Sequence, residues 1–243
     1  MNTVKNIKEE LTREYKYRIE LHAHTKPASP CSEILPEELV KTYAELGYDA
    51  VVITNHFLKW VFREKTKEEA LDTYLKDFED ARAAAEKYGL KVYLGAEMRF
   101  EDYINDYLVY GVDRSILSDC YDYFDKGVEA YRRDIKLDKS VFLQAHPFRN
   151  DMTLVNPEIL DGIEVFNMHP VHNSRVGLAS KYAKEKGFGI ITAGSDYHHK
   201  DRGHEGVSAL RTKLLPEDGF GIAEILKSGD YLLEIGGEQI ILP

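Results

Sequence analysis

Ile19–His24 reads IELHAH, an apolar run that ends in two histidines with one residue between them. A strand places alternate side chains on the same face, so His22 and His24 point the same way, roughly 7 Å apart given the rise of an extended chain. Two imidazoles placed like this are able to share one metal ion. Because isolated His-x-His pairs are common on protein surfaces, the metal hypothesis depends on what the rest of the chain places beside this pair.

Polar residues follow several other apolar runs of the chain. Residues 49–54 form a continuous run rich in β-branched side chains, typical of a strand buried on both faces, and Asn55 and His56 come directly after it. Three further runs end in the same way, 91–97 at Glu97, 141–146 at His146 and 189–196 at Asp196, with His198 two residues later. Each run therefore delivers an imidazole or a carboxylate at its end.

Helices are expected between these strands. The sequence predicts helices over about 36–46, 68–88, 115–133, 173–186 and 219–228, further strands over 103–112 and 162–167, and apolar runs at 231–235 and 239–242. Strands that alternate with helices at this spacing indicate parallel βαβ units, and about seven such units favour a barrel over an open sheet. In either arrangement the carboxyl ends of the strands meet at one rim, where the histidines and acids are expected to gather.

Composition limits the class of protein. A chain of 243 residues with 43% apolar content is expected to form one α/β domain, covering 1–243. The net charge of −10 argues against non-specific attraction to nucleic acid or to an anionic membrane surface. Two cysteines, Cys31 and Cys120, exclude a disulfide-rich scaffold. Neither a signal peptide nor an apolar run of the roughly 18 residues that span a bilayer is recognisable, so a cytoplasmic location is expected.

The residue types at the strand ends indicate metal binding. Neutral imidazole and carboxylate suit zinc, manganese and iron, and this set exceeds what one four-coordinate ion requires. More than one ion is therefore expected. A bridging carboxylate holds two cations about 3.5–4 Å apart by giving an oxygen to each, and Glu97 is the candidate for this bridge.

Read together, the motifs of this chain resemble those of the PHP (polymerase and histidinol phosphatase) superfamily. They are His22-x-His24, Asn55-His56, Gly95-x-Glu97, Ala145-His146-Pro147 and Ser195-Asp196-Tyr197-His198, and the resemblance runs from about residue 18 to 210. It implies an α/β fold, a distorted (βα)7 barrel with the metal site at the C-terminal rim of the strands. It also implies two or three divalent ions and, as in many members, hydrolysis of phosphoesters.

The resemblance also implies a distribution of ligands. One ion would be held by His22, His24, Glu97 and Asp196, a second by Glu97 and His146, and a third would face His56 and His198. Three features depart from the family pattern. Ser29 and Pro30 stand where many relatives have an Asp or His, and Asn55 stands where an Asp is usual. Asp106 falls where several relatives carry a histidine ligand; it is either a substitute ligand or a solvated acid on a strand face.

Phosphoester hydrolysis needs a nucleophile at neutral pH, stabilisation of the phosphoryl oxygens and a proton for the leaving group. His198, or His146 where it is not fully engaged as a ligand, is the candidate general acid. Arginine suits phosphate because its planar fork meets two oxygens at once. Arg149 is the first candidate because it lies three residues after His146, followed by Arg99 and by Arg175, for which a helix-surface role is the alternative.

Other polar residues near these strands have simpler interpretations. His169 and His172 follow a strand end and are expected to line the rim, and His199 and His204 are expected in a loop. Glu164 and Asn167 are expected to orient ligands by hydrogen bonds. Cys31 is either a soft ligand or, more simply, a small loop thiol.

The sequence thus predicts a metal-dependent phosphoesterase, an enzyme with manganese, iron or zinc as cofactor. Small phosphorylated metabolites or nucleotides are the expected substrates, without a stable nucleic-acid complex or a membrane partner, since the chain is acidic and lacks a basic tract interleaved with aromatics. A histidinol-phosphate phosphatase and an exonuclease acting on short oligonucleotides remain alternatives, as does a metal-binding barrel without catalytic activity. The oligomeric state is left open.

Overall fold

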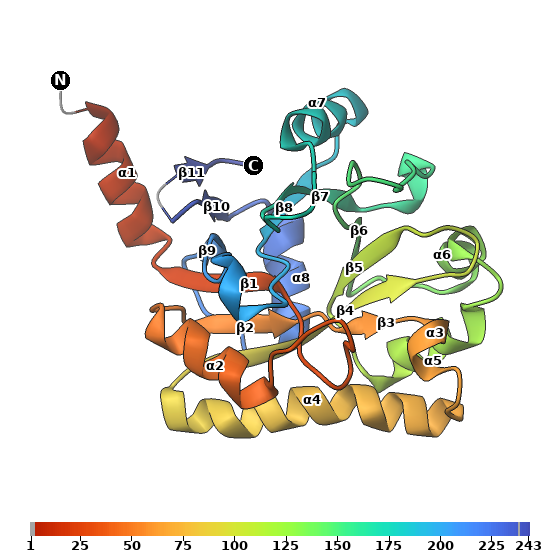
Figure 1. Cartoon of the computed structure of the whole chain (residues 1–243). Coiled ribbons are helices and arrows are strands. Elements are labelled where there is room, and N and C mark those ends of the chain that lie inside the picture. The colour runs from red at the N-terminus through yellow and green to blue at the C-terminus, as the bar shows by residue number, and fades with distance from the viewer. Residues whose placement is uncertain (1–2, 238) are drawn as a thin grey trace.

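The computed structural model describes residues 3–237 and 239–243, whose strands form one curled sheet (Figure 1). Within these residues the strand order is β11-β10-β9-β1-β2-β4-β5-β6-β7-β8, and β3 pairs with β4 beside this path. The strands are β1 (Tyr17–Ala23), β2 (Ala50–Ile53), β3 (His56–Phe57), β4 (Lys91–Arg99), β5 (Asp106–Tyr110), β6 (Val141–Gln144), β7 (Gly162–Asn167), β8 (Ile190–Gly194), β9 (Ser208–Thr212), β10 (Leu232–Ile235) and β11 (Gln239–Ile241). The helices are α1 (Thr3–Glu14), α2 (Pro36–Glu45), α3 (Lys59–Phe62), α4 (Lys67–Tyr88), α5 (Arg114–Tyr123), α6 (Val128–Asp134), α7 (Val176–Lys186) and α8 (Gly219–Ser228).

The sheet closes on itself where the chain after β8 meets β1. Tyr197 forms a parallel bridge with Ala23. The backbone N–H of His24 donates to the carbonyl oxygen of Tyr197 at 3.0 Å, and the N–H of Tyr197 donates to the carbonyl oxygen of His22 at 3.3 Å. The first half of β1, Tyr17–Ile19, pairs instead with β9, antiparallel. Strands β1, β2, β4, β5, β6, β7 and β8 thus form the expected distorted barrel, and β9, β10 and β11 extend its wall.

One part of the barrel departs from the expected parallel βαβ pattern. β5 runs antiparallel to both β4 and β6. The physical reason is the short link 100–105, since a parallel crossover needs about a dozen residues or more. In this register Asp106, the first residue of β5, lies opposite Arg99, the last residue of β4. The start of β5 therefore reaches the same rim as the ends of the parallel strands.

The expected helices are present, with one interruption. α4 begins at a capping box, in which Thr66 and Glu69 accept from each other's backbone N–H groups, and it ends at Gly89 in the left-handed conformation. It packs along α2 and β4, on the outside of the barrel (Figure 1). The expected helix over 115–133 is broken into α5 and α6 at Gly127, whose φ of +86° suits glycine and where a Cβ atom would lie 2.4 Å from a carboxylate oxygen.

The apolar core fills the barrel and leaves one rim for polar side chains. Leu108 of β5 and Leu143 of β6 are fully buried in one cluster with Ala223 of α8. α8 packs against β4, β5 and β6, close to Gly111 just after β5, so it covers the end opposite Asp106. Within residues 3–237 and 239–243, every helix is too short or too polar to cross a bilayer.

Candidate metal centre

The structure brings the predicted metal ligands to the rim opposite α8. His22 lies in β1 and His24 directly follows it; His56 begins β3, Glu97 lies in β4 and Asp106 begins β5. His146 follows β6, and Asp196 and His198 follow β8. Apart from His56, which is slightly exposed, all of these side chains are buried. Residues far apart in the sequence thus form one continuous cluster of imidazoles and carboxylates.

His22, His24 and Asp196 form the most compact part of this cluster. Nε2 of His22 and Nε2 of His24 lie 3.5 and 3.4 Å from Oδ1 of Asp196, and their atoms are close enough to hold one ion. Ligand atoms of a tetrahedral ion with bonds of about 2.1 Å lie about 3.4 Å apart, which matches these separations. Both Nε2 atoms are buried and lack a hydrogen-bond partner. A metal ion fits here because it would satisfy both nitrogens.

Hydrogen bonds on the far side of each ring point these nitrogens toward the cluster. Nδ1 of His22 donates to Oε1 of Glu164 at 2.7 Å, so in the neutral imidazole that binds a metal the lone pair is on Nε2. Nδ1 of His24 lies 3.1 Å from Oγ of Ser29, whose own proton goes to Oδ1 of Asn55 at 3.0 Å. The Ser29 hydroxyl therefore accepts from His24, and the His24 lone pair is again on Nε2. Ser29 and Asn55, which depart from the family pattern, orient the imidazole of the predicted ligand His24.

Glu97 lies among four imidazoles. Its Oε1 atom is 3.5 Å from Nε2 of His22 and 3.1 Å from Nε2 of His146, while Oε2 is 3.5 Å from Nε2 of His24 and 2.8 Å from Nδ1 of His56. Burial raises the pKa of the Glu97 carboxyl, but the charges of His56 and His22 outweigh burial and hold it well below its usual range. Each oxygen faces a different pair of rings, as a carboxylate that bridges two ions requires.

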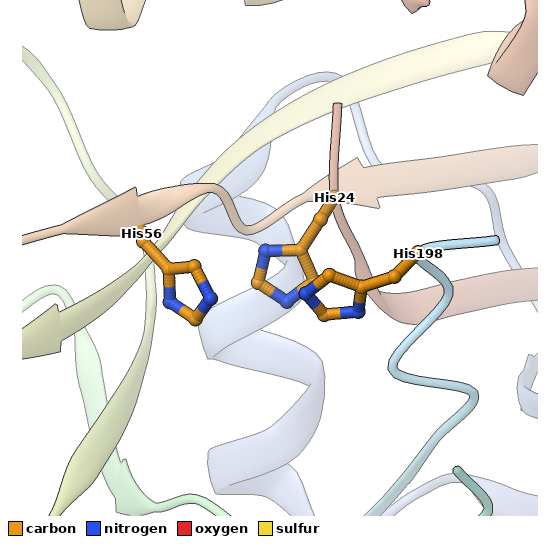
Figure 2. Close-up of side chains that lie close together, drawn as sticks. All are labelled: His24, His56 and His198. Carbon is orange, nitrogen blue, oxygen red and sulfur yellow. The ribbon is translucent and has the colours of Figure 1, made fainter. Parts of the chain in front are cut away.

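His24, His56 and His198 form a second group of potential ligands (Figure 2). The ring of His24 lies between the other two, with centroids 4.6 Å from His56 and 4.0 Å from His198. Burial and the neighbouring imidazoles lower the pKa of His24, so it is neutral at pH 7 in the metal-free protein. Cys31, in the turn after β1, lines the same cavity as His56 and His198, and its interaction with these two histidines lowers the pKa of its thiol.

Asp106 belongs to the cluster but has another partner. It is fully buried, so it is not a solvated acid on a strand face. Its carboxylate lies close enough to His56 and Glu97 to share an ion with them. However, both of its oxygens accept from Arg99, each at 2.7 Å, in a bidentate pair. We favour the ion pair as its main role, because neither oxygen lacks a partner.

A layer of hydrogen bonds holds the ligands in place. Glu164 accepts from the backbone N–H of His146 at 3.0 Å, and Nδ2 of Asn167 donates to Glu164 at 3.0 Å and to Asp196 at 3.2 Å. His146 and Asp196 have φ values of 28° and 52°, a left-handed conformation that non-glycine residues adopt where the surroundings enforce it. The orienting role expected of Glu164 and Asn167 agrees with these contacts.

Sequence reasoning missed Glu20, which lies between the two ligand-bearing segments. Its buried carboxylate accepts from the backbone N–H of His22 at 2.9 Å, from the N–H of Ser195 at 3.0 Å and from the hydroxyl of Tyr43 at 3.0 Å. Burial raises the pKa of Glu20 despite these hydrogen bonds. An acid in the middle of an apolar strand was the signal available in the sequence.

A cavity of about 190 Å³ opens over the cluster, lined by Cys31, His56, Glu97, Arg99, Arg149, His169, His172, Asp196, His198, His199 and Arg202. Arg149 and Arg99, the two arginines predicted first to bind phosphate, both line this cavity. His172 comes closer than expected, with Nδ1 3.3 Å from Oδ2 of Asp196. Arg202 was not predicted, because an arginine in a single 3-10 turn carries no sequence signal. His204, expected in a loop, is buried there and accepts from the backbone N–H of His198 at 3.4 Å.

Arg175 does not line this cavity. Its Nη1 atom donates to the carbonyl oxygen of Phe148 and its Nη2 atom donates to Oδ1 of Asn150, both at 2.6 Å. The guanidinium is thus engaged in holding the loop after β6, and the surface role given as the alternative describes it better than phosphate binding.

Residues 20–198, most of the chain and all of the cluster, match the PHP domain family. The chain belongs to the PHP family. A stretch of 112 residues, 46% of the chain, is 30% identical to a DNA polymerase III PolC-type protein of Oceanobacillus iheyensis. The match covers 7% of that polymerase, so the chain spans only a small part of this relative's length.

Solved structures share the fold of this PHP domain. A two-domain protein of Bacteroides vulgatus, described as containing a predicted PHP-like metal-dependent phosphoesterase, superposes on 90% of this chain and 65% of its own, with a TM-score of 0.63 and 18% identity. PsfC of Pseudomonas syringae covers 83% of this chain and 84% of its own, with a TM-score of 0.53 and 13% identity. A putative metal-dependent phosphoesterase of Bifidobacterium adolescentis covers 77% of this chain and 91% of its own, with a TM-score of 0.50 and 17% identity.

Proposed function

We propose that this PHP domain is a metal-dependent phosphoesterase that hydrolyses small phosphorylated metabolites or nucleotides with two or three divalent ions. The observation that carries the proposal is the set of buried, unpartnered ligand atoms around Glu97. These atoms are Nε2 of His22 and Nε2 of His24. Unsatisfied buried polar atoms are costly, and divalent ions account for all of them.

Each part of the cluster has a task in this proposal. His22, His24 and Asp196 would hold one ion, Glu97 and His146 would hold a second, and His56 and His198 would face a third. When bound, such ions lower the pKa of a water to supply a nucleophile and stabilise negative charge on phosphoryl oxygens. The chain keeps the carboxylate of Asp196 deprotonated, since the charges of His22 and His198 hold its pKa well below its usual range against the effect of burial.

His198 is the better placed of the two candidate proton donors. It lines the cavity, whereas His146 is buried against Glu97 and is not part of the lining. Burial lowers the pKa of His198, but the charge of Asp196 outweighs burial and raises it to about 9 in the metal-free protein. With two ions bound, a protonated His198 is able to donate from Nε2 to the leaving oxygen, because Nδ1 is held by the carbonyl oxygen of Asp196 at 2.8 Å.

Three arginines of the lining suit the phosphate group. Arg149 and Arg202 make no ion pair with any residue in 3–237 and 239–243, so their guanidinium groups are available. Arg99 is held by Asp106 through Nε and Nη2, which leaves Nη1 for an anion. These charges lie beside the cluster on an otherwise acidic chain, and they support a small anionic substrate.

The test is turnover of a panel of phosphomonoesters by protein loaded with manganese, iron or zinc. We expect activity that Asp196→Asn lowers by more than about 100-fold, since it removes a ligand charge while keeping the side-chain shape. The exposed Asp138→Asn is the matched control and should keep wild-type rates. Metal analysis of the same samples gives the number of ions per chain. Two or more bound ions without turnover of any ester would favour the binding-only alternative.

An oligonucleotide exonuclease is the second candidate, favoured by the similarity to part of a DNA polymerase. Short single-stranded oligonucleotides belong in the same panel. Hydrolysis of these in preference to mononucleotides, with a rate that falls steeply as salt rises, would support this candidate.

A further inference from the structure

Large apolar side chains are exposed next to the metal-site cavity. Phe57, the last residue of β3, and Phe62, the last residue of α3, are buried, and their rings pack together with centroids 5.2 Å apart. Trp60, between them in the sequence, is 60% exposed. Tyr103 and Ile104, in the link between β4 and β5, are about half exposed. Packing in the core therefore explains why Phe57 and Phe62 are aromatic, but it does not explain the exposed indole of Trp60.

Two further hollows connect the metal cavity to Trp60. The first, about 220 Å³, shares Cys31, His56 and Arg99 with the metal cavity and extends to Leu58 and Trp60. The second hollow, about 460 Å³, shares Leu58, Trp60 and Arg99 with the first. It continues to Tyr103 and Ile104. One groove thus leads from the ligands past Arg99 to an indole ring and then to an aromatic and an aliphatic side chain.

The charges along the groove change with distance from the cluster. Arg99 stands at the junction of all three hollows. The far hollow is lined by Glu101 and Asp102, which would repel a second phosphate. The guanidinium of Arg63 lies 5.2 Å from the centre of the Trp60 ring and helps to fix the indole. Such a groove fits one phosphate at the metal end and an uncharged, flat group at the other.

We propose that this groove binds the organic part of the substrate and that Trp60 stacks on a planar aromatic ring there. The preferred substrate class is then a phosphomonoester whose leaving group carries such a ring at a distance from the phosphate, as a nucleobase does in a mononucleotide. Stacking of a base on an aromatic side chain is strong enough to govern preference among small esters. The inference rests on the proposed function for the position of the phosphate, but binding in the groove does not require turnover.

Trp60 is the single tryptophan of the chain, so intrinsic fluorescence reports on the groove directly. The probes are the uncleavable 5′-methylenephosphonate of adenosine and methylphosphonate, added to the zinc-loaded protein. We expect the adenosine probe to change the fluorescence and to bind at least about tenfold more tightly than methylphosphonate. By calorimetry, Trp60→Leu should lose this preference, Trp60→Phe should retain most of it, and Leu214→Ala, an exposed apolar residue elsewhere, should behave as wild type.

Kinetics provide the second readout. Adenosine 5′-monophosphate and ribose 5-phosphate differ only in the base, and we expect Trp60→Leu to lower kcat/KM for the first by about tenfold, mainly through KM, with little change for the second. If the preference for the adenosine probe over methylphosphonate were the same in wild type and in Trp60→Leu, the inference would be overturned, even if esters are hydrolysed. Tighter binding of a dinucleotide than of the mononucleotide would also overturn it. Trp60-dependent binding without turnover would instead support the groove and remove the proposed hydrolysis.

Discussion

Glu164 determines the orientation of His22 without facing the cavity. Its Oε1 atom accepts from Nδ1 of His22 at 2.7 Å, and Oε2 accepts from the backbone of His146 and from Asn167. One carboxylate therefore positions two predicted ligands, His22 directly and His146 through its backbone. The charge on Glu164 also makes Nε2 of His22 a stronger electron donor.

We expect Glu164→Gln to weaken metal binding by about 10–100-fold, because a neutral amide orients the imidazole less firmly and polarises it less. Competition between the protein and a chromophoric zinc chelator measures this affinity. Glu158→Gln, an exposed residue in the turn before β7, is the control and should bind zinc like wild type. Equal affinities for the two variants would contradict the orienting role of Glu164.

Cys31 and Cys120 differ in reactivity for reasons that the structure makes plain. Burial raises the pKa of the Cys31 thiol, but hydrogen bonds from His198 and His56 outweigh burial and lower it to about 6. Cys120 is fully buried in α5, and burial raises its pKa well above the usual range. At pH 7, Cys31 is therefore mostly thiolate and Cys120 is a thiol.

In the metal-free protein, iodoacetamide should modify Cys31 and leave Cys120 intact at pH 7. Because the thiolate is the reacting form and exists above the pKa, the rate should rise through about pH 6 and then level off. Peptide mass spectrometry at a series of pH values measures both sites. Cys31→Ser should abolish the fast modification, and a rate that rises only near pH 8.5 would show that the two histidines do not act on this thiol.

At the level of the elements, Gly194 at the end of β8 permits close contact with β1. A Cβ atom at this position would lie 2.4 Å from Cβ of His22 and 2.4 Å from Oε1 of Glu164. Gly189, just before the same strand, has nothing within 4 Å of its Cβ position. The two glycines thus form a matched pair for testing how closely the strand ends must approach.

We expect Gly194→Ala to destabilise the fold by about 1–3 kcal/mol and to weaken metal binding, because the added methyl group pushes His22 away from Glu164. For a chain of this size each kcal/mol lowers Tm by about 2–4 °C. Thermal unfolding and zinc affinity of Gly194→Ala and of the control Gly189→Ala provide the measurement. A Gly194→Ala protein with unchanged Tm and affinity would mean that β1 and β8 tolerate a wider spacing.

The sequence predicts elements well where local chemistry decides them. The strand ends that carry His22, His56, Glu97 and Asp196 were all located, because a buried strand followed by an abrupt polar residue is a local pattern. The direction of β5 was missed, since it depends on whether six residues make a turn or a crossover. β9 was missed as well, because its role as a partner of β1 depends on the tertiary fold.

The candidate site shows the same limit. Ligand types were readable because imidazole and carboxylate are unusual at the ends of apolar runs. The hydrogen-bond partners of those predicted ligands were harder to predict from the sequence. Glu20 accepts a hydrogen bond from Ser195, which is 175 residues away in the sequence, and the pairing of Arg99 with Asp106 follows from the β4–β5 register. Such contacts exist only once the barrel has closed.

At the scale of the whole molecule, the seam of the barrel and the metal cluster coincide. The chain after β8 meets β1 through backbone hydrogen bonds between Tyr197 and both His22 and His24. The predicted ligands His22, His24 and Asp196 lie on or next to these same residues. An ion bound by them joins the first and last strands of the barrel, so metal binding and closure of the barrel are expected to stabilise each other.

Removal of the ions with a chelator should therefore open the seam before the rest of the fold. At a metal concentration of about 100 times Kd, binding contributes about 2.7 kcal/mol, so Tm should fall by about 5–10 °C on chelation. Hydrogen exchange should accelerate at the amides of His24 and Tyr197, while Leu233, paired with Leu210 in the wall away from the cluster, should keep its rate. Asp196→Asn should already show the faster exchange and respond little to the chelator. Uniform acceleration over all strands would indicate that the ions stabilise the molecule globally and do not act at the seam.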